Sequence, residues 1–169
     1  MTTTATRLPP VLLGAVVLHT VVLPQLRLFG VAADLLLLVA IAAGLSAGAD
    51  RGAVVGFVAG LLADCFLQTP FGLSALTYSL VAYGVGAFQS TILHVGRWIP
   101  VLVTMVASVL GVALFAAAGV VLGQDHLISP RLATIAGVVA VLNGLASPLM
   151  VRLMRWVAAP TLASTPLLR

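Results

Sequence analysis

Charged residues are scarce in this sequence. Only 7% of its 169 residues are charged, whereas about a quarter of the residues of a typical soluble domain carry charge. Hydrophobic residues account for 62% of the chain, and its mean hydropathy is +1.23. This balance argues against an ordinary soluble protein. It predicts an all-α membrane protein that forms a single integral-membrane domain over residues 1–169.

Lysine and glutamate are absent, and cysteine occurs once. All eight basic residues are arginine and all four acidic residues are aspartate. The arginines are scattered along the chain, so the net charge of +4 does not indicate a nucleic-acid partner. Cys65 cannot form an intramolecular disulfide and has no metal-ligating residues around it. We therefore expect neither a metal site nor a cofactor.

Six apolar segments fill nearly the whole chain. Pro9 and Pro10 suit the start of the first helix, and Asp50 is the predicted N-cap of the third. Pro148 interrupts the last segment and is expected to kink it. The connections are too short for a further domain. We predict transmembrane helices over about residues 10–26, 31–48, 51–67, 71–93, 98–123 and 131–157.

The distribution of arginines predicts the orientation in the membrane. With a cytoplasmic N-terminus, only Arg27 and Arg131 lie outside, and the excess of arginine on the inner side follows the positive-inside rule. Because all charged side chains are arginine or aspartate, the sequence indicates a GC-rich, bacterial genome. We therefore expect a multi-pass protein of the bacterial cell membrane with both termini in the cytoplasm. The arginines expected inside are Arg7, Arg51, Arg97, Arg152, Arg155 and Arg169.

Glycines recur every four residues from Gly44, and Asp64 takes the next place in the series. On a helix, Gly52, Gly56, Gly60 and Asp64 form one stripe, because four residues advance about 400°. Such small residues allow a neighbouring helix to approach closely. We call Gly52, Gly56 and Gly60 the glycine seam and expect it to pack on helices of the same chain. Since exposing a charge to hydrocarbon costs at least about 2.5 kcal/mol, Asp64 should face protein or a wet cavity.

Asp34, His19 and Tyr78 are predicted at the same depth as Asp64, in the outer half of the membrane. Simpler interpretations exist for each: Asp34 suits the first turn of a helix with Arg27 nearby, and His19 suits a hydrogen-bonded packing residue. Together with Asp64, these residues are the candidates for a partner-binding or polar-cavity site. The same set could form a minimal small-molecule site. The two aspartates are the only intramembrane acid pair, which gives little support to a membrane enzyme.

Three stretches give the sequence a recognisable pattern. They are ADLLLLV at residues 33–39, DRGAVVGFVAGLLADC at 50–65 and TPFGLSALTYSLVAYGVG at 69–86. With the Asn-Gly…Pro-Leu pattern at residues 143–149, they resemble the family of the bacterial rod shape-determining protein MreD. Ala33 departs from that family, which commonly has proline before the aspartate.

The resemblance implies a non-enzymatic membrane scaffold of the cell-elongation complex that supports cell shape and peptidoglycan synthesis. Its implied direct partner is an MreC-like single-span protein, with indirect links to the MreB filament and the RodA–transpeptidase synthase. The implied fold is similar to the substrate-binding subunits of energy-coupling-factor transporters: a six-helix bundle with a cavity open to the outside. The alternative function is therefore a substrate-binding subunit of a vitamin-type transporter.

Overall fold

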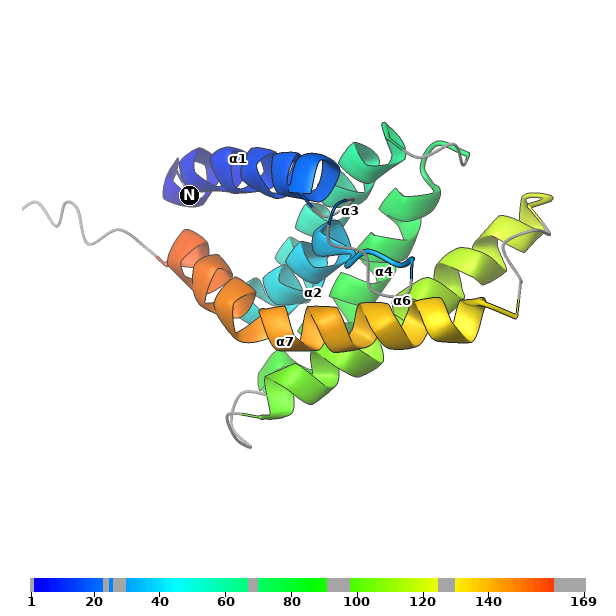
Figure 1. The fold of residues 1–169 in the computed structure, drawn as a ribbon. Coiled ribbons are helices and arrows are strands. Elements are labelled where there is room, and N and C mark those ends of the chain that lie inside the picture. Colours follow the sequence, from blue (N-terminus) through cyan, green and yellow to red (C-terminus); the bar gives the residue numbers. More distant parts are fainter. Residues whose placement is uncertain are drawn as a thin grey trace, which may run out of the picture.

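The computed structural model describes residues 2–22, 25, 30–66, 70–90, 98–124 and 130–159, with side chains from residue 7 onward except that of Val22. The chain forms an all-helical fold (Figure 1). Its elements are α1 (Thr2–Val17), a π-helical turn η1 (Leu18–Val22), α2 (Leu35–Ala47), α3 (Ala49–Asp64), α4 (Leu73–Ala87), α6 (Ile99–Val121) and α7 (Leu132–Ala158).

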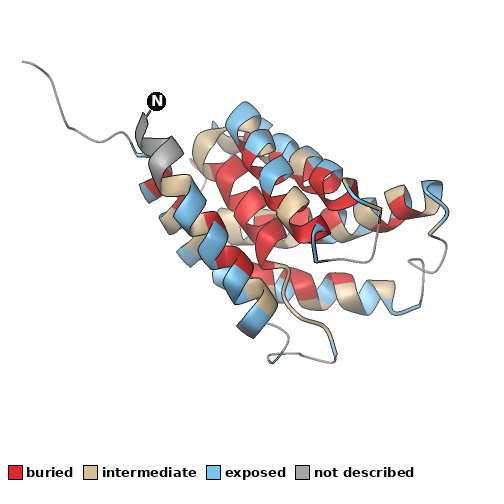
Figure 2. Ribbon diagram, turned by 90° about the horizontal axis from the view of Figure 1, so that it is seen from above, coloured by how far each residue is buried: buried red, intermediate tan, exposed pale blue. Residues whose placement is uncertain are grey.

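Helix α2 lies at the centre of the bundle. Every residue from Leu35 to Leu45 is buried, and Figure 2 shows α2 as the helix with the most continuous buried surface. α2 contacts α1, α3, α4, α6 and α7. A helix that is hydrophobic on all sides belongs in an interior. The leucine run that follows Asp34 therefore forms the core around which the other helices pack.

A single residue joins α2 to α3. Gly48 has a φ of +87°, a left-handed conformation that glycine adopts without strain, and it lets the chain reverse directly into the next helix. The predicted N-cap at Asp50 is wrong, because Gly48 is the N-cap and α3 begins at Ala49. Asp50 instead lies exposed in the first turn, where its charge favours the positive end of the helix dipole.

Helices α6 and α7 pack along each other and form the long side of the bundle. α7 continues through Pro148 to Ala158 and bends in its orange part (Figure 1). Pro148 has no N–H to bond to the carbonyl four residues earlier, at Gly144. The Ser147 hydroxyl donates a hydrogen bond to that carbonyl oxygen at 2.9 Å. The chain thus satisfies the acceptor that the proline leaves free.

The helices occur in the predicted order, but several ends differ. α1 begins at Thr2 and runs through Pro9 and Pro10, since proline accepts a helical φ at the cost of backbone hydrogen bonds. α2 begins later than residue 31, because Asp34 caps it. α3 ends at Asp64, before the predicted end at residue 67. Several predicted positions lie outside the described residues, namely 23, 24, 26, 67, 91–93, Arg27, Arg97 and Arg169.

Two of the described helices, α6 and α7, are long and apolar enough to cross a membrane. α2 and α4 have 13 and 15 residues, fewer than the roughly 20 that a helix usually needs to span the hydrocarbon core. One side of α6 is buried against neighbouring helices through Thr104, Ala107, Ser108 and Gly111. Small and hydroxyl-bearing residues suit such close contact between helices.

Candidate functional site

The glycine seam lies against the backbone of neighbouring helices of the same chain. A methyl group placed on Gly56 would stand 2.6 Å from the Tyr78 carbonyl oxygen of α4, which is too close for any real side chain. A methyl group on Gly60 would collide with the backbone of Ala75, also in α4. One on Gly52 would meet the backbone of α2. The absence of side chains in the seam therefore lets α3 approach its neighbours at backbone contact distance.

Asp64 ends the seam and caps the next helix. Its carboxylate accepts hydrogen bonds from the backbone N–H groups of Gly72 at 2.8 Å, Ser74 at 3.0 Å and Ala75 at 3.4 Å. The first N–H groups of a helix have no partner within that helix, and Gly72, the N-cap of α4, has no side chain to supply one. Asp64 is only 4% exposed. Its charge is stabilised by these bonds and by the positive end of the α4 dipole.

Asp34 connects α2 to α4. Its Oδ1 atom accepts a hydrogen bond from the Leu37 N–H at 3.0 Å, which makes Asp34 the N-cap of α2 rather than a residue of its first turn. Its Oδ2 atom accepts a hydrogen bond from the Tyr78 hydroxyl at 2.5 Å. Arg27, the partner expected from the sequence, lies outside the described residues. The polar partner that the structure gives Asp34 is thus Tyr78, 44 residues further along the chain.

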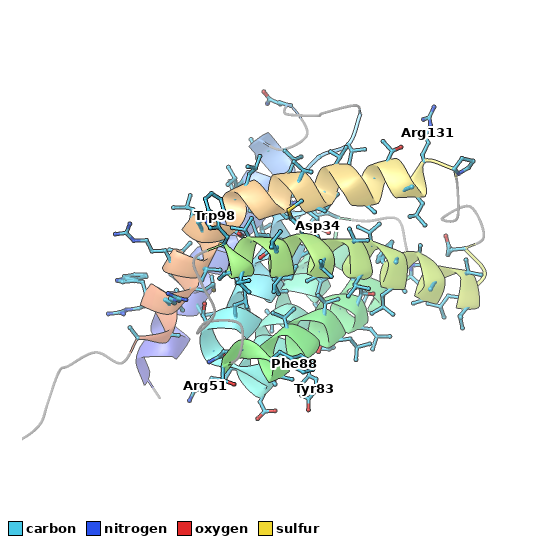
Figure 3. The ribbon with its side chains drawn as sticks, turned by 90° about the horizontal axis from the view of Figure 1, so that it is seen from below. Asp34, Arg51, Tyr83, Phe88, Trp98 and Arg131 are labelled. Carbon is cyan, nitrogen blue, oxygen red and sulfur yellow. The ribbon has the colours of Figure 1, made fainter. Side chains whose placement is uncertain are left out.

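A cavity of about 270 Å³ opens beside this pair, and we call it the Asp34 cavity. His19, Asp34 and Tyr78 line it together with apolar residues of α6 and α7, and Figure 3 shows Asp34 between these two helices. The His19 Nδ1 atom is buried without a hydrogen-bond partner in the part of the chain that the structure describes. A carboxylate and an imidazole facing one small volume can hold a hydrogen-bonding group of a ligand or of a partner protein.

Three of the four predicted polar residues therefore line one cavity, and the fourth does not. Asp64 points to the start of α4, although its neighbour Ala63 lines the Asp34 cavity. The arrangement includes one buried polar pair to which the sequence analysis gave no role. The Asn143 side-chain amide donates to the Ser108 hydroxyl at 3.1 Å and links α7 to α6. Asparagine and serine within long apolar helices are the signal that indicates such a link.

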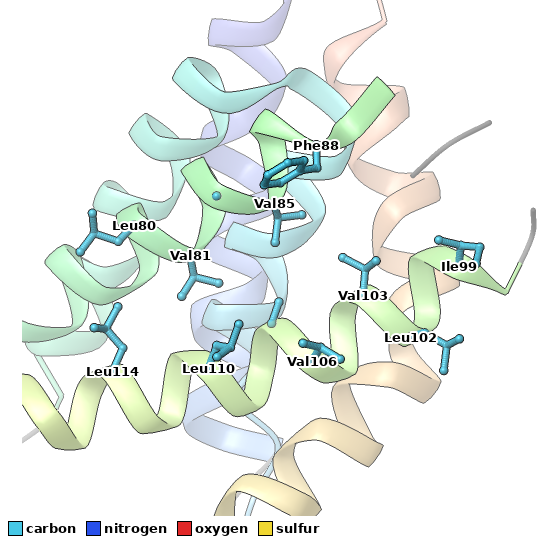
Figure 4. Close-up of a pocket in the computed structure, with 12 residues that line it drawn as sticks. Leu80, Val81, Val85, Phe88, Ile99, Leu102, Val103, Val106, Leu110 and Leu114 are labelled. Atoms are coloured by element: carbon cyan, nitrogen blue, oxygen red, sulfur yellow. The ribbon is translucent and has the colours of Figure 1, made fainter. Parts of the chain in front are cut away.

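An apolar groove of about 710 Å³, larger than the Asp34 cavity, lies between α4 and α6, and we call it the α4–α6 groove (Figure 4). The sequence does not predict this groove, because apolar surface in a membrane protein gives no distinctive pattern. Gly84 lines it, and a methyl group placed there would meet no neighbouring side chain or helix within 4 Å. The residues that line the groove are Leu80, Val81, Gly84, Val85, Phe88, Ile99, Leu102, Val103, Val106, Ala107, Leu110 and Leu114.

Comparison with known protein families identifies this chain. The model of the family described as rod shape-determining protein MreD matches residues 3–157 of the 169. Comparisons with curated proteins and with solved structures give no significant match. The family match confirms the resemblance drawn from the three stretches. The family consists of membrane proteins, and membership implies a role in rod shape determination. The chain belongs to the rod shape-determining protein MreD family.

Proposed function

We propose that the protein is a non-enzymatic scaffold of the bacterial cell-elongation complex and that it binds the membrane span of an MreC-like protein. Family membership supports the role in cell shape. The observation that carries the proposed partner is the α4–α6 groove, which has an apolar lining and extends over most of the length of a transmembrane helix. Through this partner, the scaffold would support peptidoglycan synthesis and connect indirectly to the MreB filament and the RodA–transpeptidase synthase.

The groove follows one face of α6. Its lining residues on this helix recur every three or four positions from Ile99 to Leu114, which corresponds to about 24 Å at 1.5 Å per residue. That length covers most of the roughly 30 Å hydrocarbon core of a bilayer. Helix α4 supplies the second wall through Leu80 and Val81. A partner helix in the groove would therefore contact α6 along most of its membrane-spanning length and α4 along about half of that contact.

Packing, rather than hydrophobicity, favours a helix in this groove over lipid chains. Helices associate in lipid through close van der Waals contact, and small residues allow that contact. Gly84 leaves open space on the α4 side of the groove, whereas Leu102, Val106 and Leu110 on α6 are 56–60% exposed. An apolar helix with small and large side chains in alternation can interlock with this surface. Acyl chains are mobile and therefore make less close van der Waals contact with a surface of fixed shape.

Asp64 supports the groove through α4. Because its carboxylate caps the start of that helix, it supports one wall of the groove without facing the groove itself. We propose that Asp64 affects partner binding by this indirect route. Asp34, His19 and Tyr78 stay available to a polar group of the partner, because they line a separate cavity.

The proposed scaffold crosses the bilayer six times, with both termini in the cytoplasm. Arg7, Arg51, Arg152 and Arg155 support this orientation through the positive-inside rule. The short helices α2 and α4 would cross within the bundle, where other helices cover α2 on all sides. A bundle similar to the substrate-binding subunits of energy-coupling-factor transporters would bring the Asp34 cavity to the outer half of the membrane.

The groove can be tested by filling it. We expect Gly84→Trp to reduce co-purification of the MreC-like protein by about ten-fold, the effect of losing a central contact worth about 1.4 kcal/mol. Gly137→Trp is the matched control: Gly137 also has nothing within 4 Å of an added methyl group, but it lies on α7 outside all three cavities. Equal capture by the wild type and Gly84→Trp, at unchanged melting temperature, would remove the groove from the proposal.

The second candidate function is the substrate-binding subunit of a vitamin-type transporter, and the Asp34 cavity is the observation that favours it. Native mass spectrometry of the purified protein distinguishes the two functions. A retained small molecule that is lost in both Asp34→Asn and Tyr78→Phe would favour transport. Co-purification of the MreC-like protein without a bound small molecule would favour the scaffold.

A further inference from the structure

A third cavity lies at the opposite end of the bundle from Arg131. It has a volume of about 350 Å³ and is bounded by α1, the α2–α3 turn and the end of α7. Figure 3 shows Arg51 toward this end and Arg131 at the other. Arg7 of α1 stacks on the Trp156 ring with 4.6 Å between guanidinium carbon and ring centroid. It also donates a hydrogen bond to the Trp156 carbonyl oxygen at 3.0 Å, and this joins α1 to α7.

This cavity, which we call the Arg51 cavity, is apolar inside and charged at its mouth. Val55, Met154 and Val157 line it and are 7%, 2% and 2% exposed. Asp50 and Arg51 also line it, and both are exposed. The volume lies within the range of about 300–1,000 Å³ that is usual for ligand pockets. The cavity therefore suits an amphipathic ligand, with an apolar part inside and a polar group outside.

The end of the bundle that holds this cavity carries an excess of positive charge. Among the described residues, this end carries four arginines (Arg7, Arg51, Arg152 and Arg155) and one acid, Asp50. Arg51, Arg152 and Arg155 form no ion pair and no side-chain hydrogen bond with any of the residues that the structure describes. Arg51 lines the cavity, and an unpaired guanidinium group at the mouth of an apolar cavity attracts an anion with an apolar tail. Guanidinium groups also bind phosphate oxygens in a bidentate manner.

We propose that the Arg51 cavity binds an anionic phospholipid, with one acyl chain against Val55 and Met154 and the phosphate group at Arg51. Basic pockets between transmembrane helices on the cytoplasmic side are typical sites for anionic headgroups. The proposed topology puts this end of the bundle on that side. Charge complementarity selects an anionic over a zwitterionic lipid, and the apolar interior selects a lipid over free phosphate. This site is separate from the α4–α6 groove and does not depend on the proposed partner.

Native mass spectrometry of the detergent-purified full chain tests the headgroup. We expect adducts with phosphatidylglycerol and few with phosphatidylcholine. Arg51→Gln should weaken phosphatidylglycerol binding about five-fold, the effect of one basic residue near a lipid surface. The same charge change at the other end, Arg131→Gln, should leave binding unchanged. Equal binding of both lipids, or equal losses in the two arginine variants, would overturn the proposal.

A substitution at Asp50 should change phosphatidylglycerol binding in the opposite direction to Arg51→Gln. Asp50→Asn removes the acid at the mouth and should increase phosphatidylglycerol binding, whereas general damage to the fold would decrease it. A decrease in this variant at unchanged melting temperature would contradict the site.

The acyl chain is tested separately. Val54 lines the cavity and is 63% exposed, so Val54→Trp can narrow the cavity without burying the new ring, and it should reduce binding. Val141→Trp is the control, because Val141 is 49% exposed and lines none of the three cavities. Excess inorganic phosphate should not displace the lipid. Displacement by phosphate, or equal binding by the two tryptophan variants, would show that the acyl chain does not occupy this cavity.

Discussion

The glycine seam with Asp64 and the Asp34 cavity each contain an aspartate at a helix end, but the surroundings differ. Asp64 accepts three backbone hydrogen bonds and is 4% exposed. Asp34 accepts one backbone hydrogen bond and one from the Tyr78 hydroxyl, and it borders an open volume. Asp64 lines none of the three cavities. The cavity beside Asp34 provides room for another molecule.

The two carboxylates therefore have different capacities for further binding. An ionised carboxylate offers about four acceptor positions. Backbone groups of α4 occupy most of those of Asp64, so its interactions stabilise the fold. Asp34 keeps free acceptor capacity beside His19, whose Nδ1 atom has no partner within the described residues. An acid in a membrane helix is thus a functional candidate only after its backbone partners have been counted.

The seam should show the largest loss of stability. We expect Gly56→Leu to lower the free energy of unfolding by about 3 kcal/mol, the upper part of the range for overpacking. The reason is that even the first carbon of the new side chain would stand 2.6 Å from the Tyr78 carbonyl oxygen. Denaturant unfolding in detergent measures the change. Gly137→Leu on α7, where nothing lies within 4 Å, should leave stability nearly unchanged. Similar behaviour of the two variants would disprove close packing at the seam.

Asp64→Leu should come next. The substitution leaves the N–H groups of Gly72 and Ser74 without their acceptor, and a buried unsatisfied donor costs about 1–3 kcal/mol. We expect a loss of about 2 kcal/mol together with weaker capture of the MreC-like partner, while the protein still inserts into the membrane. Asp64→Asn should lose less, because the amide oxygen still accepts one of these bonds. Wild-type stability in Asp64→Leu would exclude the cap as a stabilising contact.

The two regions also differ in how far the sequence predicts them. The four-residue spacing of the seam predicts close helix packing by itself, since the geometry of a helix converts spacing into a stripe. The cap by Asp64 is not predictable in this way. Its donors begin eight residues further along the chain, beyond a turn whose conformation local sequence does not determine. The sequence predicts that Asp64 avoids lipid, but not which groups it contacts.

The fold, too, is predictable from the sequence only in part. The leucine run after Asp34 predicts a helix, but only the arrangement of the other helices puts α2 at the centre. The bond between Asp34 and Tyr78 spans 44 residues and depends on that arrangement. Local rules also misjudge helix ends. Asp50 was predicted as an N-cap, but it lies in the first turn of α3, where it interacts with the helix dipole. Pro9 and Pro10 were predicted at a helix start, but α1 continues through both. Properties of a single helix were thus predictable, whereas contacts between helices required the structure.

Tyr78→Phe measures the bond at the Asp34 cavity with little change in volume. Removal of the hydroxyl should cost about 1.5 kcal/mol, the lower part of the range for hydrogen bonds to charged groups. Tyr83→Phe is the matched control in the same helix: Tyr83 is 52% exposed, and exposed substitutions usually change stability by less than about 0.5 kcal/mol. Chemical unfolding of both variants in one detergent gives the comparison. If the two variants lose equal stability, the bond to Asp34 adds nothing to the fold.

His19→Leu should have the smallest effect on stability, and it best separates a binding role at the Asp34 cavity from the stabilising role of Asp64. The imidazole Nδ1 atom is buried without a partner in the described part of the chain, so leucine removes an unsatisfied polar group. We expect the free energy of unfolding to stay within about 0.5 kcal/mol of the wild type or to rise slightly. Binding at the Asp34 cavity, measured as ligand retention or partner capture, should fall in the same variant, because the ligand or partner loses a hydrogen-bonding group there. A stable variant with weakened binding would assign His19 to recognition, in contrast to Asp64, where stability and binding should fall together.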